Sequence, residues 1–273
     1  MKLGFIGGGN MATALIGGLL HKGYPANAIE VAETNPERRA WLTHEFGVST
    51  HENSAAIGAA DVILLAVKPQ QLQAILSTLP KLRPEQLVLS IAAGVRAVDI
   101  ARWLGDHNAV VRAMPNTPAL IGAGITGLFA LPEVSAAQHA QASEILEAVG
   151  SVVWVDQETQ IDAVTAISGS GPAYVFYFIE ALEQAAIDLG LPAATARLLT
   201  LQTFFGAAAL AIKDPIPPAE LRARVTSKGG TTERGILALE EGGVSYAIGL
   251  AARAAAERAI EIGDLLGQNG TPS

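Results

Sequence analysis

The sequence contains no cysteine among its 273 residues, and aromatic residues make up only 5% of it. Without thiols the chain has no disulfide, no zinc–thiolate site and no cysteine nucleophile. Charged residues are sparse at 16%, and they leave a net charge of -8 with no basic stripe or tail. Nucleic acid and acidic membrane surfaces are therefore poor partners for this chain, and a small molecule fits better.

Long uninterrupted apolar runs are missing as well. The longest, near residues 204–212, is well short of the roughly 20 residues that span a bilayer. Lys2 and the apolar residues after it could imitate a secretory signal, but the glycines at 7–9 and Asn10 would interrupt its apolar core. We therefore expect no membrane span, no export signal and a cytoplasmic location. None of the five histidines lies in a metal-ligand spacing, so no metal site is expected.

A glycine-rich segment follows the first apolar run of the chain. Residues 3–6 have the pattern of a strand, and G-x-G-x-x-A at Gly7, Gly9 and Ala12 leads directly into an apolar helical stretch. Gly7 permits a tight turn, Gly9 leaves room for a pyrophosphate, and Ala12 allows close helix packing. The helix start offers free N–H groups to an anion, so this context predicts a dinucleotide site. The predicted turn comprises Gly7, Gly8, Gly9, Asn10 and Met11.

Up to residue 157, short β-type runs alternate with helical segments, the pattern of βαβ units in a mainly parallel sheet. We expect strands over residues 3–6, 29–32, 62–67, 87–92, 110–114, 125–130 and 152–155. We expect helices over residues 13–20, 36–46, 70–76, 98–104 and 135–149. The run at 62–67 is apolar throughout, as a strand covered by helices on both faces should be.

After residue 157 the strand signal disappears. Helical patterns follow over residues 159–189, 192–212, 219–226, 231–240 and 244–266. Several of these helices are apolar over most of their circumference, so we expect a second subunit to cover them. The predicted fold class is α/β: a Rossmann-type doubly wound sheet over residues 1–157, followed by an all-helical dimerisation domain over residues 158–273.

The loop after the second predicted strand offers two ways to hold an adenosine ribose. Glu33 can accept both ribose hydroxyls, which favours NAD. Thr34, Asn35 and the arginines of the next helix could instead hold the 2′-phosphate of NADP if Glu33 turns away. Arg38 and Arg39 could equally be charges on a helix surface. The sequence leaves the cofactor open between NADPH and NADH.

Three more loops follow predicted strands, at the edge where open parallel sheets bind ligands. Pro69 stiffens the first, so that backbone near Lys68 can lie against a ribose or nicotinamide, although Lys68 could equally be a solvated loop residue. In the third, prolines flank Asn116 and Thr117 and aim polar groups at the crevice, either for a nicotinamide carboxamide or as a rigid turn. The candidate residues are Ala66, Val67, Lys68 and Pro69, then Ala92, Ala93 and Gly94, then Asn116.

Two glycine-containing segments stand out in the helical half. Residues 168–174 would interrupt one long helix, because Gly and Pro destabilise a helix interior by roughly 1 and 3 kcal/mol. A kink that admits a ligand, or close helix packing, should compensate. The loop at 226–233 opens a helix, and its N–H groups with the hydroxyls of Ser227, Thr231 and Thr232 form a candidate carboxylate site. A plainly capped helix is the alternative.

These segments occur in the order seen in pyrroline-5-carboxylate reductases, and the sequence resembles that family over almost its whole length. The motifs lie at residues 7–12, 66–69, 92–94, 114–118, 168–174 and 227–232. The resemblance implies a cytoplasmic NAD(P)H-dependent reductase that makes proline, with a Rossmann domain and a helical domain that interlocks with a second subunit. It also implies that Asn53, Lys68, Ala93 and Asn116 lie along the cofactor, and that Ser227, Gly230, Thr231 and Thr232 hold the substrate.

The expected reaction is hydride transfer from nicotinamide C4 to the C=N carbon of Δ1-pyrroline-5-carboxylate, giving L-proline. A cyclic imine takes up a proton more easily than a ketone, so positioning can provide much of the rate. Thr232 is the candidate that donates to or accepts from the ring nitrogen, while N–H groups of the glycine loop hold the carboxylate. The expected substrate site comprises Ser170, Ser227, Gly229, Gly230, Thr231 and Thr232.

The sequence departs from the family's pattern at two places, and two alternatives are left open. Before the short helix that precedes the glycine loop, where some relatives have a glutamate near the ring nitrogen, this sequence has Asp214 and Pro215, and Asp214 is assigned no role. Glu33 stands where members of the family often carry a small hydroxyl residue, which leaves the preference for NADP open. A β-hydroxyacid dehydrogenase would share the domain order, but such enzymes use a lysine on the interdomain helix, and residues 159–189 contain none. A nucleotide-sensing or PLP-linked binding module without turnover is the non-enzymatic alternative.

Overall fold

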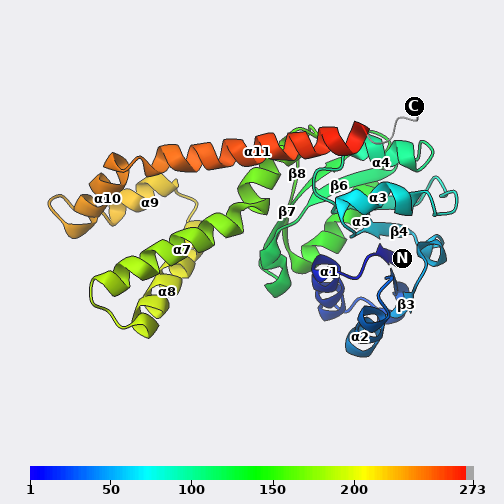
Figure 1. The fold of residues 1–273 in the computed structure, drawn as a ribbon, viewed down its shortest axis with the longest axis horizontal. Helices are drawn as coiled ribbons and strands as arrows, with labels where there is room; N and C mark the ends of the chain where they lie inside the picture. Colours follow the sequence, from blue (N-terminus) through cyan, green and yellow to red (C-terminus); the bar gives the residue numbers. More distant parts are fainter. Residues whose placement is uncertain (269–273) are drawn as a thin grey trace. The chain divides into compact units, whose positions relative to one another are not determined.

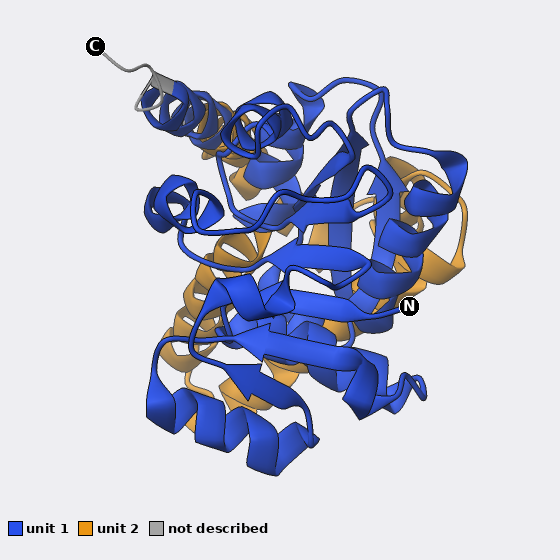
Figure 2. Ribbon diagram, turned by 90° about the vertical axis from the view of Figure 1, so that its right-hand side faces the viewer, with its two compact units in different colours: residues 1–170, 254–273 blue, residues 171–253 orange. Residues whose placement is uncertain are grey.

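The computed structural model describes residues 1–268, so residues 269–273 of the predicted helical domain lie outside the described residues. The chain divides into two compact units (Figure 2). Unit 1 is Met1–Ser170 with Ala254–Ser273, and unit 2 is Gly171–Arg253. The sequence placed a domain boundary after residue 157, whereas the compact units divide after Ser170. The segment up to Ser170 stays with the sheet because it packs tightly there: a Cβ on Gly127 would lie 2.6 Å from the Val164 side chain.

Unit 1 contains an eight-stranded sheet in the order β3-β2-β1-β4-β5-β6-β7-β8 (Figure 1). In the described part of the chain, β6 and β7 run antiparallel and the other neighbouring strands run parallel. This doubly wound order confirms the predicted α/β class. The strands are β1 Leu3–Ile6, β2 Ile29–Ala32, β3 Ser49–His51, β4 Val62–Leu65, β5 Leu87–Ser90, β6 Val110–Met114, β7 Gly124–Ala130 and β8 Gly150–Trp154.

Helices cover both faces of this sheet. They are α1 Asn10–His21, α2 Pro36–Phe46, α3 Pro69–Leu76, α4 Ala97–Trp103, α5 Ala136–Leu146 and α6 Gln160–Val164, with short turns η1 Ala26–Ala28, η2 Ser54–Ile57, η3 Thr117–Ile121, η4 Glu147–Val149 and the π-turn η5 Thr165–Gly169. On one face Leu15 of α1 and Leu42 of α2 belong to a common apolar core. On the other, Leu72 of α3 and Ile100 of α4 do so. Strand β4 is buried throughout its length because it contributes to both cores.

Local signals set the ends of α2. The side chain of Asn35 accepts the N–H of Arg38 at 3.0 Å, Pro36 takes the first helical position, and Gly47 ends the helix in the left-handed conformation at φ 68°. This is the usual distribution of capping residues, and it explains why the predicted helix at 36–46 matches the structure. Strand β3 was not predicted. Its residues Ser49, Thr50 and His51 have no apolar alternation, and pairing with β2 defines the strand.

Every element of unit 2 is a helix. The helices are α7 Gly171–Asp188, α8 Ala193–Lys213, α9 Pro218–Arg224 and α10 Thr231–Glu241, and α11 Val244–Gln268 begins in unit 2 and ends in unit 1. The long helix predicted at 159–189 is divided into α6, the π-turn and α7. Gly169 lies in that π-turn, and a Cβ there would lie 2.5 Å from Cε of Met114. Close packing therefore accounts for one of the two glycines of this interruption.

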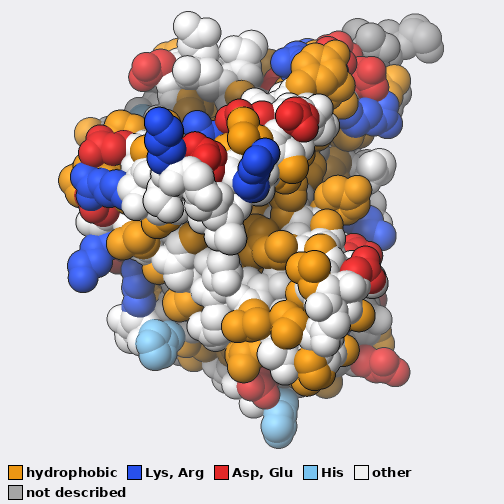
Figure 3. Space-filling model, turned by 90° about the vertical axis from the view of Figure 1, so that its left-hand side faces the viewer, with side chains coloured by type: hydrophobic (Ala, Val, Ile, Leu, Met, Phe, Trp, Pro, Cys, Tyr) orange, Lys and Arg blue, Asp and Glu red, His pale blue; other side chains and the backbone are white. Residues whose placement is uncertain are grey.

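Apolar side chains reach the surface of the helical unit (Figure 3). Phe205 is 73% exposed and Ile212 is 87% exposed in the single chain. Within residues 1–268, one helix, α8, is long and apolar enough to cross a membrane by length and composition, with a hydropathy of 1.3. The expectation of no span rested on uninterrupted runs, whereas α8 mixes its apolar residues with threonine, glutamine and arginine. A helix that packs against a second subunit can have the same composition.

Candidate active site

The glycine turn after β1 has the geometry that the sequence predicted. Gly7 has φ +97°, and a Cβ on it would lie 2.6 Å from the carbonyl oxygen of Ala66. Only glycine fits such a position without strain. At Gly9, in contrast, a Cβ would meet no atom of the chain within 4 Å. Gly9 precedes the first turn of α1, whose amides have no intrahelical acceptor, so this open space is suited to a pyrophosphate.

A cavity of about 860 Å³ lies along this turn and the neighbouring strand ends. Its volume suits a dinucleotide-sized ligand. Predicted cofactor residues that line it are Gly7, Gly9, Glu33, Thr34, Asn53, Ala66, Val67 and Lys68. Gly8, Asn10, Met11, Asn35 and Pro69 adjoin these residues in the chain. Four other predicted cofactor residues do not line this cavity: Ala92, Ala93, Gly94 and Asn116.

Glu33 lines the cavity, but the protein itself engages both oxygens of its carboxylate. Oε2 accepts the N–H of Gly8 at 2.9 Å, and Oε1 accepts the N–H of Asn35 at 2.9 Å. The hydroxyl of Thr34 lies 3.5 Å from Oε1. The carboxylate therefore joins the loops after β1 and β2 and turns toward backbone donors.

The two arginines of α2 bind backbone carbonyls near this carboxylate. Arg39 donates to the carbonyls of Glu33 and Thr34 at 2.6 and 2.8 Å. Arg38 donates to the carbonyl of Gly8 at 2.7 Å, and its guanidinium lies 4.2 Å from the centre of the Trp41 ring. These contacts go beyond those of freely solvated surface charges. They keep positive charge beside the loop of Thr34, where a 2′-phosphate would bind.

The loops after β4 and β6 differ in their contacts. Lys68 precedes α3, with Pro69 at the first helical position, and it faces the cavity. Asn53 caps η2 by accepting the N–H of Ala55 at 2.9 Å, which leaves its amide N–H groups for other partners. Asn116 is 9% exposed, and its side-chain oxygen accepts the N–H of Ile125 at 3.0 Å. This bond supports the alternative in which Asn116 shapes a rigid turn, and its amide N–H groups can still donate.

The predicted substrate loop belongs to unit 2. Gly229 has φ +73°, and its N–H donates to the Glu233 carboxylate at 2.8 Å. The N–H of Gly230 donates to the carbonyl of Ser227 at 3.0 Å, and a Cβ on Gly230 would lie 2.6 Å from Oγ of Ser227. Helix α10 starts at Thr231, so the amides of Thr231 and Thr232 belong to its first turn. One amide of this loop is thus bound by the protein's own carboxylate, as in the capped-helix alternative, and the substrate-carboxylate site stays a prediction.

The π-turn before α7 brings Ser168 and Ser170 to one segment of unit 1. The hydroxyl of Ser168 donates to the carbonyl of Val164 at 3.0 Å, and the N–H of Ser170 donates to the carbonyl of Thr165 at 2.8 Å. Gly169 packs against Met114 of β6. Isolated π-turns often occur at functional sites. This contact places the segment of Ser170 beside the strand that leads to Asn116.

Sequence reasoning missed several polar residues of the main cavity. They are Glu52, Ser54, Gln71 and Thr78. Ser54 and Thr78 lie 2.8 Å apart through their hydroxyls, which joins η2 to the end of α3. Gln71 lies two residues after Pro69, in the first turn of α3. Its place directly after the loop that follows β4 is the signal that could have identified it.

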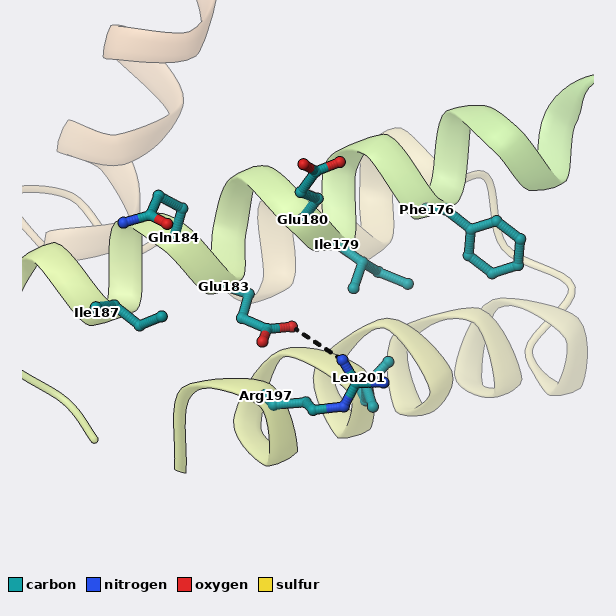
Figure 4. A pocket seen from close by; sticks show the side chains of 8 residues that line it. All are labelled: Phe176, Ile179, Glu180, Glu183, Gln184, Ile187, Arg197 and Leu201. Atoms are coloured by element: carbon teal, nitrogen blue, oxygen red, sulfur yellow. Dashed lines mark ion pairs between the residues drawn. The ribbon is translucent and has the colours of Figure 1, made fainter. Parts of the chain in front are cut away.

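A second cavity, of about 440 Å³, lies between α7 and α8 (Figure 4). Phe176, Ile179 and Leu201 provide its apolar part. Glu183 and Arg197 face each other across it with 3.7 Å between their charged groups. It contains none of the predicted site residues. In residues 1–268, no three acidic or histidine side chains form a group that could hold a metal ion.

The sheet order and the cavity at its carboxyl edge define a Rossmann-type dinucleotide-binding protein with a helical extension. Residues 2–94 match the family model described as "NADP oxidoreductase coenzyme F420-dependent", and residues 158–262 match "Pyrroline-5-carboxylate reductase dimerisation". The chain is 48% identical to a pyrroline-5-carboxylate reductase of Pseudomonas aeruginosa over 98% of both chains. It therefore belongs to the pyrroline-5-carboxylate reductase family, which confirms the resemblance seen in the sequence.

Solved structures agree with this assignment. A pyrroline-5-carboxylate reductase from Coxiella burnetii superimposes with a TM-score of 0.89 at 42% identity, over 96% of this chain and 98% of that one. The Plasmodium falciparum pyrroline carboxylate reductase, solved with NADP bound, has a TM-score of 0.86 at 28% identity over the same shares of the two chains, 96% and 98%. Family membership excludes the β-hydroxyacid dehydrogenase alternative.

Proposed function

We propose that this chain reduces the C=N bond of Δ1-pyrroline-5-carboxylate to give L-proline, with NADPH or NADH as the hydride source. The observation that carries this proposal is the 48% identity to a pyrroline-5-carboxylate reductase over 98% of both chains. The cavity beside the glycine turn supports it independently, because it combines a dinucleotide-sized volume with an open approach at Gly9. When bound, the reduced nicotinamide supplies the hydride.

The N-terminal unit supplies the groups that hold the cofactor. The first-turn amides of α1 bind the diphosphate beside Gly9. Thr34, Asn35 and the guanidinium of Arg39 hold the 2′-phosphate, which favours NADPH over NADH. Two observations support this preference: the Glu33 carboxylate is turned onto backbone N–H groups, and Arg39 lies against the carbonyl of Thr34. Asn53, Lys68, the loop at 92–94 and Asn116 lie along the remaining length of the cofactor.

The loop before α10 supplies the groups that hold the substrate. The amides of Thr231 and Thr232 and the hydroxyl of Ser227 bind the carboxylate of the imine. Gly229 and Gly230, whose own N–H groups bond within the loop, leave room for that carboxylate to approach. The Thr232 hydroxyl hydrogen-bonds to the ring nitrogen, which takes up one proton from solvent as the imine carbon receives hydride. Ser170 of unit 1 is a further candidate for contact with the substrate. Because protonation of an imine is easy, orientation by these groups provides much of the rate.

We also infer that the enzyme is a homo-oligomer that joins through its helical unit. The dimerisation family model covers residues 158–262, and exposed apolar side chains such as Phe205 and Ile212 lie within that range. Burying them against a second copy removes apolar surface from water. For the compartment we infer the cytoplasm, on the resemblance to a cytoplasmic family.

The test is turnover by the purified full chain. We expect loss of reduced-nicotinamide absorbance with pyrroline-5-carboxylate, accumulation of L-proline on chromatography, and a higher kcat/KM with NADPH than with NADH. 1-Pyrroline, which has the same imine without the carboxylate, serves as the matched control and should react much less efficiently. Oxidation of neither nicotinamide would contradict the proposal. Tight NADPH binding without oxidation would favour a binding module instead.

A further inference from the structure

The end of α11 packs directly against the loop between β5 and α4 (Figure 1). Gly94 of this loop has φ +77°, and a Cβ on it would lie 2.5 Å from Cγ2 of Ile262. From the other side, a Cβ on Gly263 would lie 3.1 Å from the carbonyl oxygen of Gly94. Two glycines thus let the helix and the loop approach without an intervening side chain.

Polar contacts reinforce this approach. Arg96 forms an ion pair with Asp264, and that hydrogen bond raises the pKa of Arg96. Arg102 of α4 donates to the carbonyl of Gly267 at 3.1 Å. Leu266 packs on the apolar core that contains Ile100. The end of α11 is therefore fixed to α4 as well as to the loop that precedes it.

The buried side chains of Ala92 and Val95 anchor this loop in the apolar core that contains Ile100, and few hydrogen bonds hold the rest of it. At its start the N–H of Ala92 donates to Oγ of Ser90 at 3.3 Å, and at its end the N–H of Ala97 donates to Glu158 at 2.7 Å. Between them Ala93 is exposed, whereas Gly94 is buried. Ile262 is the side chain against which the middle of the loop rests, so it sets how far Ala93 projects from the edge of the sheet.

We propose that Ile262 is a positioning residue for hydride transfer. By supporting Gly94 it holds the backbone at Ala93 in the place where that backbone meets the nicotinamide half of the cofactor. This inference rests on the proposed function, which assigns the loop at 92–94 to the cofactor. Ile262 acts through Gly94 and therefore affects orientation at the reacting end more than affinity at the adenosine end.

The first test replaces Ile262 by alanine in the full chain. Misplacement by a fraction of an ångström at a reacting centre is costly, so we expect Ile262→Ala to lower kcat about tenfold while KM for NADPH changes less than about threefold. Leu265→Ala is the matched control, since Leu265 is on the same helix, is 57% exposed and lies beyond residues 158–262 of the dimerisation model. It should leave kcat and KM unchanged.

The second test asks whether Ile262 acts through Gly94. Gly94→Ala adds a methyl group that would collide with Ile262 and also strains the backbone. In a double-mutant cycle the backbone strain cancels, so Gly94→Ala should cost less activity in the Ile262→Ala background than in the wild type.

Two results would overturn the proposal. One is an Ile262→Ala variant that loses thermal stability but keeps the kcat of Leu265→Ala, which would make the contact purely structural. The other is a double-mutant cycle in which Gly94→Ala lowers activity by the same factor in the wild type and in the Ile262→Ala background. Both require an active wild-type chain, so they are distinct from failure of the proposed function, in which the wild type itself does not oxidise NADPH and both proposals fall.

Discussion

The carboxylate of Glu33 accepts the backbone N–H of Gly8, with 2.9 Å between Oε2 and the nitrogen. Its second oxygen accepts the N–H of Asn35 at the same distance, 2.9 Å. One acidic side chain thus links the turn predicted to hold the diphosphate with the loop predicted to hold the ribose. Hydrogen bonds to a carboxylate are among the stronger ones in proteins, so they compete with ribose hydroxyls for the same oxygens.

Glu33→Gln should shift the cofactor preference toward NADPH. Glutamine keeps the size and one acceptor for these amides, but it removes a negative charge beside the expected 2′-phosphate. Charges about 4 Å apart in water interact by about 1 kcal/mol, so the NADPH to NADH ratio of kcat/KM should rise about fivefold. KM should rise for both cofactors because one of the two hydrogen bonds between this side chain and the backbone N–H groups of Gly8 and Asn35 is lost. Steady-state kinetics with each cofactor measures this ratio.

Glu37→Gln is the matched control for this prediction. Glu37 is exposed on α2, four positions beyond Glu33, and it carries the same charge. A general change in the field near the site would move both variants equally. If Glu37→Gln changes the ratio as much as Glu33→Gln does, or if Glu33→Gln shifts it toward NADH, the carboxylate of Glu33 does not govern the choice.

Gly7→Ala should lower the stability of the fold, whereas Gly9→Ala should weaken cofactor binding. Alanine at Gly7 meets the Ala66 carbonyl at 2.6 Å in a left-handed conformation, so we expect a loss of stability of about 2 kcal/mol or more. Alanine at Gly9 meets nothing within 4 Å, so that variant should unfold like the wild type. Its methyl group would instead occupy the approach of the diphosphate and raise the Kd for NADPH at least about tenfold. Urea unfolding and fluorescence titration separate the two effects, and an unimpaired Kd for Gly9→Ala would move the diphosphate elsewhere.

Sequence patterns predicted those parts of the fold that depend on neighbours in the chain. Helix α2 has its cap, its proline and its terminal glycine within a few positions, and β4 is apolar on both faces. Strand β3 escaped prediction because its residues 49–51 are polar and only pairing with β2 makes them a strand. The π-turn at Thr165–Gly169 escaped for a related reason, since contact with Met114 is what stabilises Gly169 there.

The candidate site shows the same division. Gly7, Glu33 and Lys68 could be predicted together because the carboxyl ends of parallel strands converge at one edge. The orientation of the Glu33 carboxylate could not, since it depends on two amides from separate loops. The contact between Gly94 and Ile262 was also out of reach, because no local pattern indicates which part of a distant helix returns to a given loop.

Thr232→Ala should lower kcat/KM for pyrroline-5-carboxylate by about tenfold to a hundredfold, the range for loss of a hydrogen bond to a charged or charging group. Thr232→Ser keeps the hydroxyl and should recover most of this activity. The helix start is unchanged in both variants, since Gly230 provides the cap. Equal kinetics for wild type and Thr232→Ala would remove this hydroxyl from the mechanism.

Arg112→Leu should destabilise the sheet domain strongly. Arg112 is 3% exposed and pairs with Glu158 at 3.2 Å and with Asp162 at 3.0 Å. Its removal leaves two largely buried carboxylates without a cation, at a cost of about 3–5 kcal/mol. Adding Glu158→Gln and Asp162→Asn removes those charges and should recover much of the loss. Urea unfolding at one fixed protein concentration measures both variants.

Arg83→Leu is the control for the buried network. Arg83 bonds to Glu85 at 2.8 Å, with the two side chains 44% and 69% exposed. Exposed pairs of this kind contribute about 0–1 kcal/mol. A loss for Arg112→Leu no larger than that for Arg83→Leu would show that the two carboxylates do not depend on the guanidinium for stability.

His107 should make stability depend on pH in the mildly acidic range. Burial lowers the pKa of its imidazole below the ordinary 6.5, and a hydrogen bond to the carbonyl of Gln86 at 2.8 Å offsets this only in part. The unfolded chain then binds more protons than the folded chain as the pH falls below 6.5. The contribution of His107 is therefore complete above pH 6.5 and is lost as the pH falls toward the folded-state pKa.

His107→Gln keeps an N–H donor for the Gln86 carbonyl but does not titrate, so the decline in unfolding free energy between neutral pH and about pH 5 should be shallower than in the wild type. His44→Gln is the control for the exchange of histidine for glutamine itself, because His44 is exposed on α2. Urea unfolding across this pH range measures the slopes. A decline in His107→Gln as steep as in the wild type would assign the pH dependence to other groups, since the substitution removes the imidazole and keeps the bond it makes.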